Sequence, residues 1–362
     1  MTADPGQPEH DAAEGGDPAG IRTGPVTAWL AEHVGTVAPL RFERLAGGHS
    51  NLTYRIDDAE GNRVVLRRPP EGDLLPTAHD MGREHRLIDA LGPTDVPVPE
   101  ALATCTDPSV TGAPFYVMAH VDGVVLHTAA DAESAFGEAE RAAIGRDFVD
   151  VLARLHAVDP DAVGLGDLSR KEDYIARQLK TWWRQYEASR TADDPLLGQV
   201  HEWLQANIPE QGPARVVHGD FRLGNTITGP DARIAAVLDW EIATLGDPLA
   251  DLGYVLATWP RPGDGLVATT SATSMAAGFP EREELLDTYA DATGADLAGI
   301  DYYVAWANWK TACIVQGVYR RYLDGQLSTA GVDVEGFRRT VEAATALAAE
   351  AIERIGSGGE GP

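Results

Sequence analysis

The sequence contains very little cysteine. Only Cys105 and Cys313 occur in 362 residues, far apart and each among apolar neighbours. Two isolated cysteines exclude the disulfide framework of small secreted domains, and they exclude a metal site built from several thiolates. We therefore expect both side chains to be buried as fillers of a hydrophobic core.

Long hydrophobic runs are also missing. No window approaches the roughly 18 uncharged apolar residues that a membrane-spanning helix needs. The N-terminal stretch MTADPGQPEHDAAEGGDPAG has neither the basic region nor the apolar core of a signal peptide. The sequence therefore predicts a cytoplasmic protein with no membrane partner.

Basic residues are scarce, and lysine most of all. The chain has 29 Lys and Arg against 56 Asp and Glu, which gives a formal net charge of −27. Nucleic acids and anionic lipids both need a basic face, so we expect the protein to bind neither. An acidic surface attracts cationic substrates, although good hydration of a soluble protein explains the same charge more simply. The only lysines are Lys171, Lys180 and Lys310, so the first 170 residues contain none.

The elements that are present indicate a strand-rich front and a helix-rich remainder. Alternating apolar residues and glycine turns predict an antiparallel meander near the start, and helical periodicity dominates after residue 123. The predicted strands are 40–46, 52–58, 63–69, 101–106 and 115–121, and the main predicted helices are 26–35, 78–92, 136–158, 174–189, 195–208 and 301–323.

This order of elements, in a chain long enough for two lobes, predicts an α+β fold. We expect a strand-rich N-lobe at residues 21–121. A larger, mainly helical C-lobe should span 122–355. Residues 1–20 and 356–362 are rich in Gly, Pro and acidic residues, and we expect both to be disordered.

The stretch ARVVHGDFRLGNTI, residues 214–227, carries the most informative spacing. Asp220 follows an apolar pair that predicts a strand end, Asn225 comes five residues later, and a second apolar run, IAAVL, leads to Asp239. Phosphoryl transfer from a nucleotide needs a carboxylate to align the acceptor hydroxyl and hard oxygen ligands for Mg²⁺. We predict that Asp220 faces the acceptor, while Asn225 and Asp239 hold the metal.

Four ordered motifs then resemble a known family. HGDFRLGN and DWE are similar to the H-R-D-x-x-x-x-N and D-F-G motifs of protein kinases, and TLGDPLADL and QGVYRR follow them. The set resembles the aminoglycoside phosphotransferase family, and within it the kinase-like domains associated with acyl-CoA dehydrogenases. Over residues 25–330 the resemblance implies a two-lobed protein-kinase-like fold, with ATP and Mg²⁺ as cofactors and a small-molecule hydroxyl as acceptor. It also implies an acyl-CoA dehydrogenase as functional partner.

On this template, LAGGHSNLTY (45–54) takes the place of the glycine-rich phosphate loop. Gly47, Gly48, Ser50 and Asn51 offer backbone and side-chain groups that hydrogen-bond phosphate oxygens. A β-hairpin turn uses the same residue types, so the downstream motifs are needed to favour the phosphate loop.

The strand lysine of protein kinases is replaced here by arginine. The VVLR run ends at Arg67, and Glu84 on the following helix is its predicted ion-pair partner. Arginine keeps the charge but is longer and planar, so the two residues are not interchangeable. Arg68 is the alternative, although strand alternation places it on the opposite face.

The segment YVMAHVDG (116–123) resembles the kinase hinge that holds adenine. The resemblance places Met118 behind the ring and assigns the hydrogen bonds to the backbone of Ala119 and Val121. It also makes His120 a hinge residue rather than a catalyst.

Several polar residues near the motifs have both a structural and a functional interpretation. Arg222 matches a catalytic-loop lysine of protein kinases and is predicted to neutralise charge on the transferring group; a solvent-facing arginine is the alternative. We expect His218 to organise the loop rather than transfer a proton. Family precedent makes Asp247 and Asp251 buried acceptors that tie the catalytic loop down, and neither is assigned to metal.

The sequence says least about which residues bind the acceptor substrate. Aromatic residues at helical spacing are usually core, so we expect Trp306 and Trp309 to be buried. Lys310 and Arg320 nevertheless offer positive charge for an anionic substrate such as a thioester of coenzyme A.

Three functions remain open from the sequence. An ATP-dependent kinase of small-molecule hydroxyls is favoured, with a hydroxyacyl-CoA or related hydroxy acid as acceptor and an aminoglycoside or amino-alcohol as the alternative. A catalytically inactive module that binds nucleotide or acyl-CoA is the second, supported by Arg67 in place of lysine. A protein kinase is disfavoured because no A-P-E-like segment follows Asp239.

Overall fold

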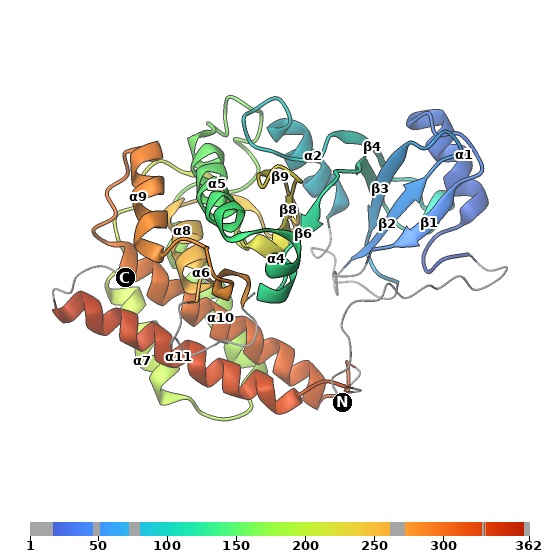
Figure 1. Ribbon diagram of the computed structural model, residues 1–362. Helices are drawn as coiled ribbons and strands as arrows, with labels where there is room; N and C mark the ends of the chain where they lie inside the picture. Colours follow the sequence, from blue (N-terminus) through green and yellow to red (C-terminus); the bar gives the residue numbers. More distant parts are fainter. Residues whose placement is uncertain are drawn as a thin grey trace. The chain divides into compact units, whose positions relative to one another are not determined.

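The computed structural model describes residues 17–45, 51–71, 80–260, 272–327, 329 and 331–357. The chain divides into two compact units. Unit 1 comprises Met1–Thr94, Val98–Asp122 and Asp239–Glu241, and unit 2 comprises Asp95–Pro97, Gly123–Leu238 and Ile242–Pro362. Unit 1 is rich in strands and unit 2 in helices (Figure 1), which confirms the predicted α+β fold.

Unit 1 is built on an antiparallel sheet with strand order β1-β2-β3-β5-β4. Thr53 lies opposite Arg67 on the neighbouring strand, and Arg67 lies opposite Tyr116. Residues directly opposite each other share a face of the sheet, so these three side chains lie on the same side. The strands are β1 (Arg41–Arg44), β2 (Leu52–Asp57), β3 (Arg63–Arg68), β4 (Ala101–Cys105) and β5 (Phe115–Ala119).

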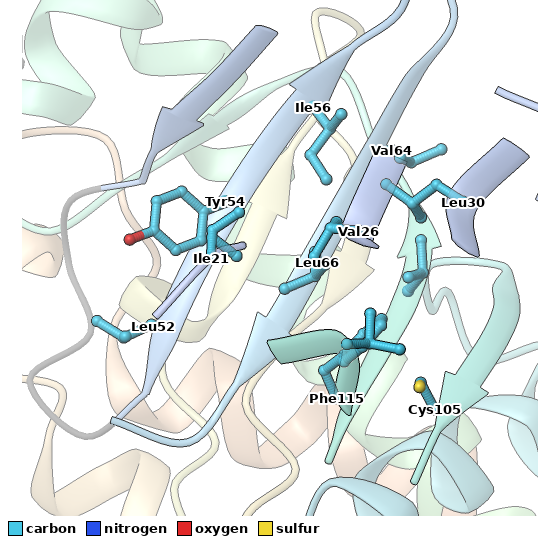
Figure 2. Close-up of a cluster of buried hydrophobic side chains, with 12 residues drawn as sticks. Ile21, Val26, Leu30, Leu52, Tyr54, Ile56, Val64, Leu66, Cys105 and Phe115 are labelled. Atoms are coloured by element: carbon cyan, nitrogen blue, oxygen red, sulfur yellow. The ribbon is translucent and has the colours of Figure 1, made fainter. Parts of the chain in front are cut away.

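The opposite face of this sheet carries the core of unit 1. Helix α1 (Thr23–His33) contributes Val26 and Leu30, which have no exposed surface, and α3 (Pro108–Thr111) contributes Val110. Alternate residues of the strands point toward them (Figure 2), because successive side chains of a strand point to opposite faces. These residues are Leu52, Tyr54 and Ile56 of β2, Val64 and Leu66 of β3, and Phe115 and Val117 of β5, with the buried Cys105 beside them.

Arg68 lies on this core face and serves the fold. Its guanidinium donates hydrogen bonds to the carbonyl groups of Gly20 and Thr111 and is almost fully buried. Arg67 is therefore the arginine of this pair that points to the other face. That face packs against α2 (Met81–Leu91). The side chain of Asp80 caps the start of this helix, and Gly92, the last residue of the predicted helix 78–92, follows its end.

Both chain ends differ in part from the expectation of disorder. Asp17 Oδ1 accepts a hydrogen bond from the Thr23 N–H, and the Ala19 carbonyl accepts one from the Tyr54 hydroxyl at 2.6 Å. Residues 17–20 are thus held against α1 and β2. At the other end, α11 extends to Ser357, so the first two residues of the predicted tail are helical.

Unit 2 consists of helices around two small antiparallel sheets, β6-β8-β9 and β10-β7. The long predicted helices are present, while α4, α9 and α11 were not predicted. The helices are α4 (Ala129–Ala135), α5 (Glu138–Ala157), α6 (Tyr174–Ser189), α7 (Pro195–Ala206), α8 (Leu249–Ala257), α9 (Arg282–Thr293), α10 (Ile300–Leu323) and α11 (Val334–Ser357), with 3₁₀ turns η1 (Leu223–Asn225) and η2 (Ala272–Met275). The strands are β6 (Val124–Val125), β7 (Arg215–Val217), β8 (Thr226–Thr228), β9 (Ile234–Val237) and β10 (Thr244–Gly246).

Helix α10 forms the centre of unit 2 and packs against α6, α8 and α11. Trp306, Trp309 and Cys313 on this helix are at most 1% exposed, which confirms their prediction as core residues. Gly253 allows α8 to pack closely against α10, because a Cβ atom at Gly253 would lie 2.5 Å from the Cβ atom of Tyr303 on α10. No helix in the described part of the chain is both long and apolar enough to cross a bilayer.

Candidate active site

The predicted ion pair between Arg67 and Glu84 is present in unit 1. Arg67 Nε lies 3.2 Å from Glu84 Oε2, and the two side chains are only 11% and 2% exposed. Strand β3 places Arg67 on the face that α2 covers, and Glu84 lies in the first turn of that helix. Tyr116, opposite Arg67 on β5, donates its hydroxyl hydrogen to the same Glu84 oxygen at 3.1 Å.

The same guanidinium also contacts the DWE segment. Arg67 Nη2 lies 2.5 Å from Asp239 Oδ1 and 3.8 Å from Glu241 Oε2, and Asn51 Nδ2 donates to Glu241 Oε2 at 3.3 Å. One arginine thus faces three carboxyl groups. Sequence reasoning missed Glu241, although its place in DWE, two residues after a predicted metal ligand, was a usable signal.

Burial and the excess of carboxyl groups around Arg67 shift the pKa values of this cluster. Burial raises the pKa of Glu84 to about 7; the charge of Arg67 opposes this shift, and the carboxylates of Asp239 and Glu241 add to it. Burial disfavours the charge of Arg67, yet Glu84 and Asp239 keep its pKa above the usual range. Arg67 therefore stays charged, and the most buried carboxyl group is the one that takes up a proton.

The raised pKa of Glu84 predicts a specific dependence of stability on pH. The folded state binds this proton more tightly than the unfolded chain, so the contribution of Glu84 is largest below pH 4.5 and is lost as the pH rises toward 7. The expected loss is on the order of 3 kcal/mol. Urea unfolding between pH 4.5 and 7.5 should show that Glu84→Gln lacks this slope, while the exposed control Glu133→Gln keeps it. Parallel curves for the wild type and Glu84→Gln would contradict the assignment.

The loop after β7 holds the predicted catalytic residues of unit 2. Asp251 Oδ2 accepts the His218 N–H at 2.6 Å, and its Oδ1 accepts the Gly219 N–H at 2.8 Å. Gly219 has a φ of 84°, a left-handed conformation that glycine adopts without strain. Burial alone would raise the pKa of Asp251, but the hydrogen bonds from His156 and the loop keep it below the usual value. Asp251 thus ties the loop down, as predicted.

His218 organises the loop from inside. Its Nδ1 accepts the Asp220 N–H at 3.2 Å, so Nε2 carries the proton and donates to the Leu238 carbonyl at 2.9 Å. Leu238 also donates its N–H to the Asn225 carbonyl at 2.8 Å. The residue before Asp239 is therefore fixed to the loop at both of its backbone groups. These contacts support the structural interpretation of His218 over proton transfer.

The carboxylate of Asp220 is held by several donors within unit 2. Asn225 Nδ2 donates to Asp220 Oδ2 at 2.7 Å and to its carbonyl at 2.9 Å, and Arg222 Nε lies 3.4 Å from Oδ2. Tyr254 donates its hydroxyl hydrogen to Oδ1 at 2.5 Å. Because the amide nitrogen of Asn225 is committed to Asp220, its amide oxygen faces away from that carboxylate. No sequence motif had indicated Tyr254.

Lys310 and Asp247 differ from their predicted roles, while that of Arg320 stays a prediction. Lys310 is only 3% exposed and donates to the Gly219 carbonyl at 2.9 Å, so it supports the loop instead of offering charge to a substrate. Arg320 is paired with Asp324 on the helix surface. Asp247 accepts from the Tyr303 hydroxyl at 2.6 Å and precedes α8, so it joins α8 to α10 instead of binding the catalytic loop.

Comparison with known proteins identifies the family. The model of the "Phosphotransferase enzyme family" matches residues 41–303. The chain belongs to this family. Among the curated relatives, mouse (Mus musculus) acyl-CoA dehydrogenase family member 10 is 37% identical over 307 residues, which cover 83% of this chain and 28% of the mouse protein. Chicken (Gallus gallus) acyl-CoA dehydrogenase family member 11 is 39% identical over 299 residues, or 80% and 38% of the two chains. The chain thus spans less than half the length of either relative.

Solved structures agree with this assignment. A Ralstonia eutropha protein assigned to the aminoglycoside phosphotransferases is 33% identical, with a TM-score of 0.75 over 90% of this chain and 98% of that one. An aminoglycoside phosphotransferase solved with AMP-PNP and hygromycin B is 18% identical, with a TM-score of 0.59 over 89% and 97%. The second likeness shows the fold alone. Together they confirm the predicted two-lobed, kinase-like architecture of the chain.

Only some of the residues predicted to contact nucleotide lie in the described part of the chain. Gly47, Gly48 and Ser50 lie outside the described residues. In the segment predicted as the hinge, the Ala119 N–H donates to the Glu100 carbonyl, so this N–H is already used within unit 1. Met118 is 7% exposed, and Val121 is half-buried.

Unit 1 also contains oxygen atoms that fit a divalent cation. Glu84 Oε1 and Asn51 Oδ1 are buried without a hydrogen-bond partner among the described residues, beside the carboxylates that face Arg67. Among the described residues, no group of three or more His, Cys, Asp or Glu side chains is placed to hold a metal ion by itself. Mg²⁺ commonly takes one or two protein oxygens and completes its shell with waters and phosphate.

Proposed function

We propose that this phosphotransferase moves the γ-phosphoryl group of ATP to a hydroxyl group of a small molecule. The observation that carries the proposal is the arrangement of Asp220. Its carboxylate is positioned by Asn225 and Tyr254, and its side chain remains 29% exposed. A carboxylate that contacts a substrate hydroxyl must be accessible in this way. Asp220 then orients the acceptor and takes up its proton.

The remaining residues have separate tasks in this proposal. The amide oxygen of Asn225 and the carboxylate of Asp239 hold Mg²⁺, which supplies positive charge that neutralises the phosphate oxygens. Arg67, kept charged by its carboxylate partners, binds phosphate oxygens in place of the usual lysine. Glu84 orients Arg67, and Arg222 stabilises negative charge near Asp220. Gly47, Gly48 and Ser50 stay predicted as the phosphate loop, and the hinge residues as the adenine site.

The relatives favour a hydroxyacyl-CoA or related hydroxy acid as acceptor. Both curated relatives are named acyl-CoA dehydrogenases and are longer than this chain, so the matching segment in each is joined to further sequence. An enzyme of that name as functional partner remains part of the proposal, as does a cytoplasmic location. An aminoglycoside is the second candidate, favoured by the net charge of −27 and by the ligand of one structural neighbour.

A panel of acceptors tests the proposal directly. The protein is incubated with ATP, Mg²⁺ and either hydroxyacyl-CoAs that differ in hydroxyl position or aminoglycosides, and products are identified by mass. We expect a hydroxyacyl-CoA to gain one phosphoryl group, while the same acyl-CoA without the hydroxyl gains none. If ATP stabilises the protein but no acceptor is ever phosphorylated, the chain is a nucleotide-binding module, the alternative favoured by Arg67.

A further inference from the structure

Tyr254 contacts the predicted catalytic carboxylate but belongs to none of the motifs that carry the proposed chemistry. It lies on α8, immediately after Gly253, whose missing side chain lets this helix pack closely against α10. The Tyr254 hydroxyl lies 2.5 Å from Asp220 Oδ1. The contact joins residues of one compact unit that are 34 positions apart in the chain.

Counting the donors on Asp220 shows where an acceptor hydroxyl has room. Each carboxylate oxygen accepts about two hydrogen bonds. Oδ2 already faces Asn225 Nδ2 at 2.7 Å and Arg222 Nε at 3.4 Å. Among the described donors, Oδ1 receives only the Tyr254 hydroxyl, so the remaining lone pair of the carboxylate lies on Oδ1. A substrate hydroxyl that binds there lies next to the tyrosine.

The surroundings of Tyr254 keep it a donor. Burial raises the pKa of its hydroxyl well above the usual value, and the negative charge of Asp220 adds to the shift. Lys310 Nζ lies 5.7 Å from the centre of the Tyr254 ring and donates to the carbonyl of Gly219, the residue before Asp220. The phenol and the lysine thus hold the side chain of Asp220 and the backbone beside it.

We propose that Tyr254 is a positioning residue for the transfer reaction. It fixes the side-chain rotation of Asp220 so that the open lone pair of Oδ1 faces the acceptor hydroxyl. Tyr254 acts through Asp220 and has no part in binding nucleotide. This inference rests on the proposed kinase activity and deepens it, because it names the residue that determines how the acceptor meets its base.

Tyr254→Phe tests the inference by removing one oxygen atom. A hydrogen bond to a charged group is lost, so we expect kcat to fall about 10- to 100-fold. The KM and Kd for ATP should change less than about twofold, because nucleotide contacts are untouched. Tyr303→Phe is the matched control, since that phenol also donates to a carboxylate, Asp247, at 2.6 Å but away from Asp220. Thermal unfolding of both variants reports any general loss of stability.

Three outcomes overturn the inference and can be told apart. If the wild type phosphorylates acceptors and Tyr254→Phe keeps the kcat of Tyr303→Phe, Tyr254 has no positioning role and the kinase proposal stands. If the wild type phosphorylates no acceptor of the panel, the proposed function fails and the role of Tyr254 falls with it. A loss of kcat with an equal loss of ATP affinity also contradicts the inference, because the effect is then not confined to Asp220.

Discussion

Asp220→Asn should reduce kcat for phosphoryl transfer by about 10³-fold or more while nucleotide binding stays nearly intact. The substitution keeps the size of the side chain but removes the charge and one acceptor oxygen. If the new carbonyl oxygen stays with Tyr254, the new amide nitrogen faces Asn225 Nδ2, another donor, so the geometry around the lost base is also disturbed. Rates are measured with the acceptor found in the panel, and ATP affinity by titration with a fluorescent nucleotide.

The control for this prediction is Asp291→Asn, which makes the same chemical change on the exposed surface of α9. We expect its rate and ATP affinity to match the wild type within about twofold. An unchanged kcat in Asp220→Asn would remove Asp220 from the reaction. A large loss of ATP affinity in that variant would show that Asp220 binds nucleotide, which the proposal does not allow.

The sequence predicts this site well where local geometry determines the outcome. Strand alternation separated Arg67 from Arg68, and the kinase resemblance indicated Glu84 on the following helix. The structure has this ion pair at 3.2 Å and places Arg68 in the core, on the opposite face. The choice between the two arginines succeeded because the period of a strand is set by the backbone alone.

Sequence spacing is a poorer guide to side-chain positions where a helix begins between the two residues concerned. Asp247 and Asp251 were expected to act together on the catalytic loop. Helix α8 begins at Leu249, so Asp247 lies before the helix and contacts Tyr303, while Asp251 lies within it and reaches the loop. Helix boundaries depend on caps and tertiary contacts that a motif does not display.

Contacts between residues far apart in the chain could not be predicted from the sequence. Lys310 was expected to be available to a substrate, because the resembling domains would hold an anionic substrate near it. In the structure it reaches Gly219, which is 91 positions earlier, with the rings of Trp182, Tyr254 and Trp306 within 6 Å of its ammonium group. Only the packing of α6, α8 and α10 brings these groups together, and no single segment encodes that packing.

Asp239→Asn is the second change with a large expected effect. Asp239 contacts Arg67 and is predicted to hold Mg²⁺, so the variant loses charge at both. Its φ of 66° is left-handed, a conformation that asparagine also adopts readily, so the backbone should not resist the substitution. We expect the Mg²⁺-dependent affinity for ATP to fall by about 100-fold and activity to fall with it.

The measurement that isolates the metal role of Asp239 is the ratio of ATP affinities with and without Mg²⁺. In the wild type this ratio should be large, because the cation screens the phosphates from the surplus carboxylates around Arg67. In Asp239→Asn it should approach one, while the exposed control Asp89→Asn on α2 keeps the wild-type ratio. A variant that binds ATP weakly but retains the full ratio would show that Asp239 acts through Arg67 and that the metal is held by other oxygens.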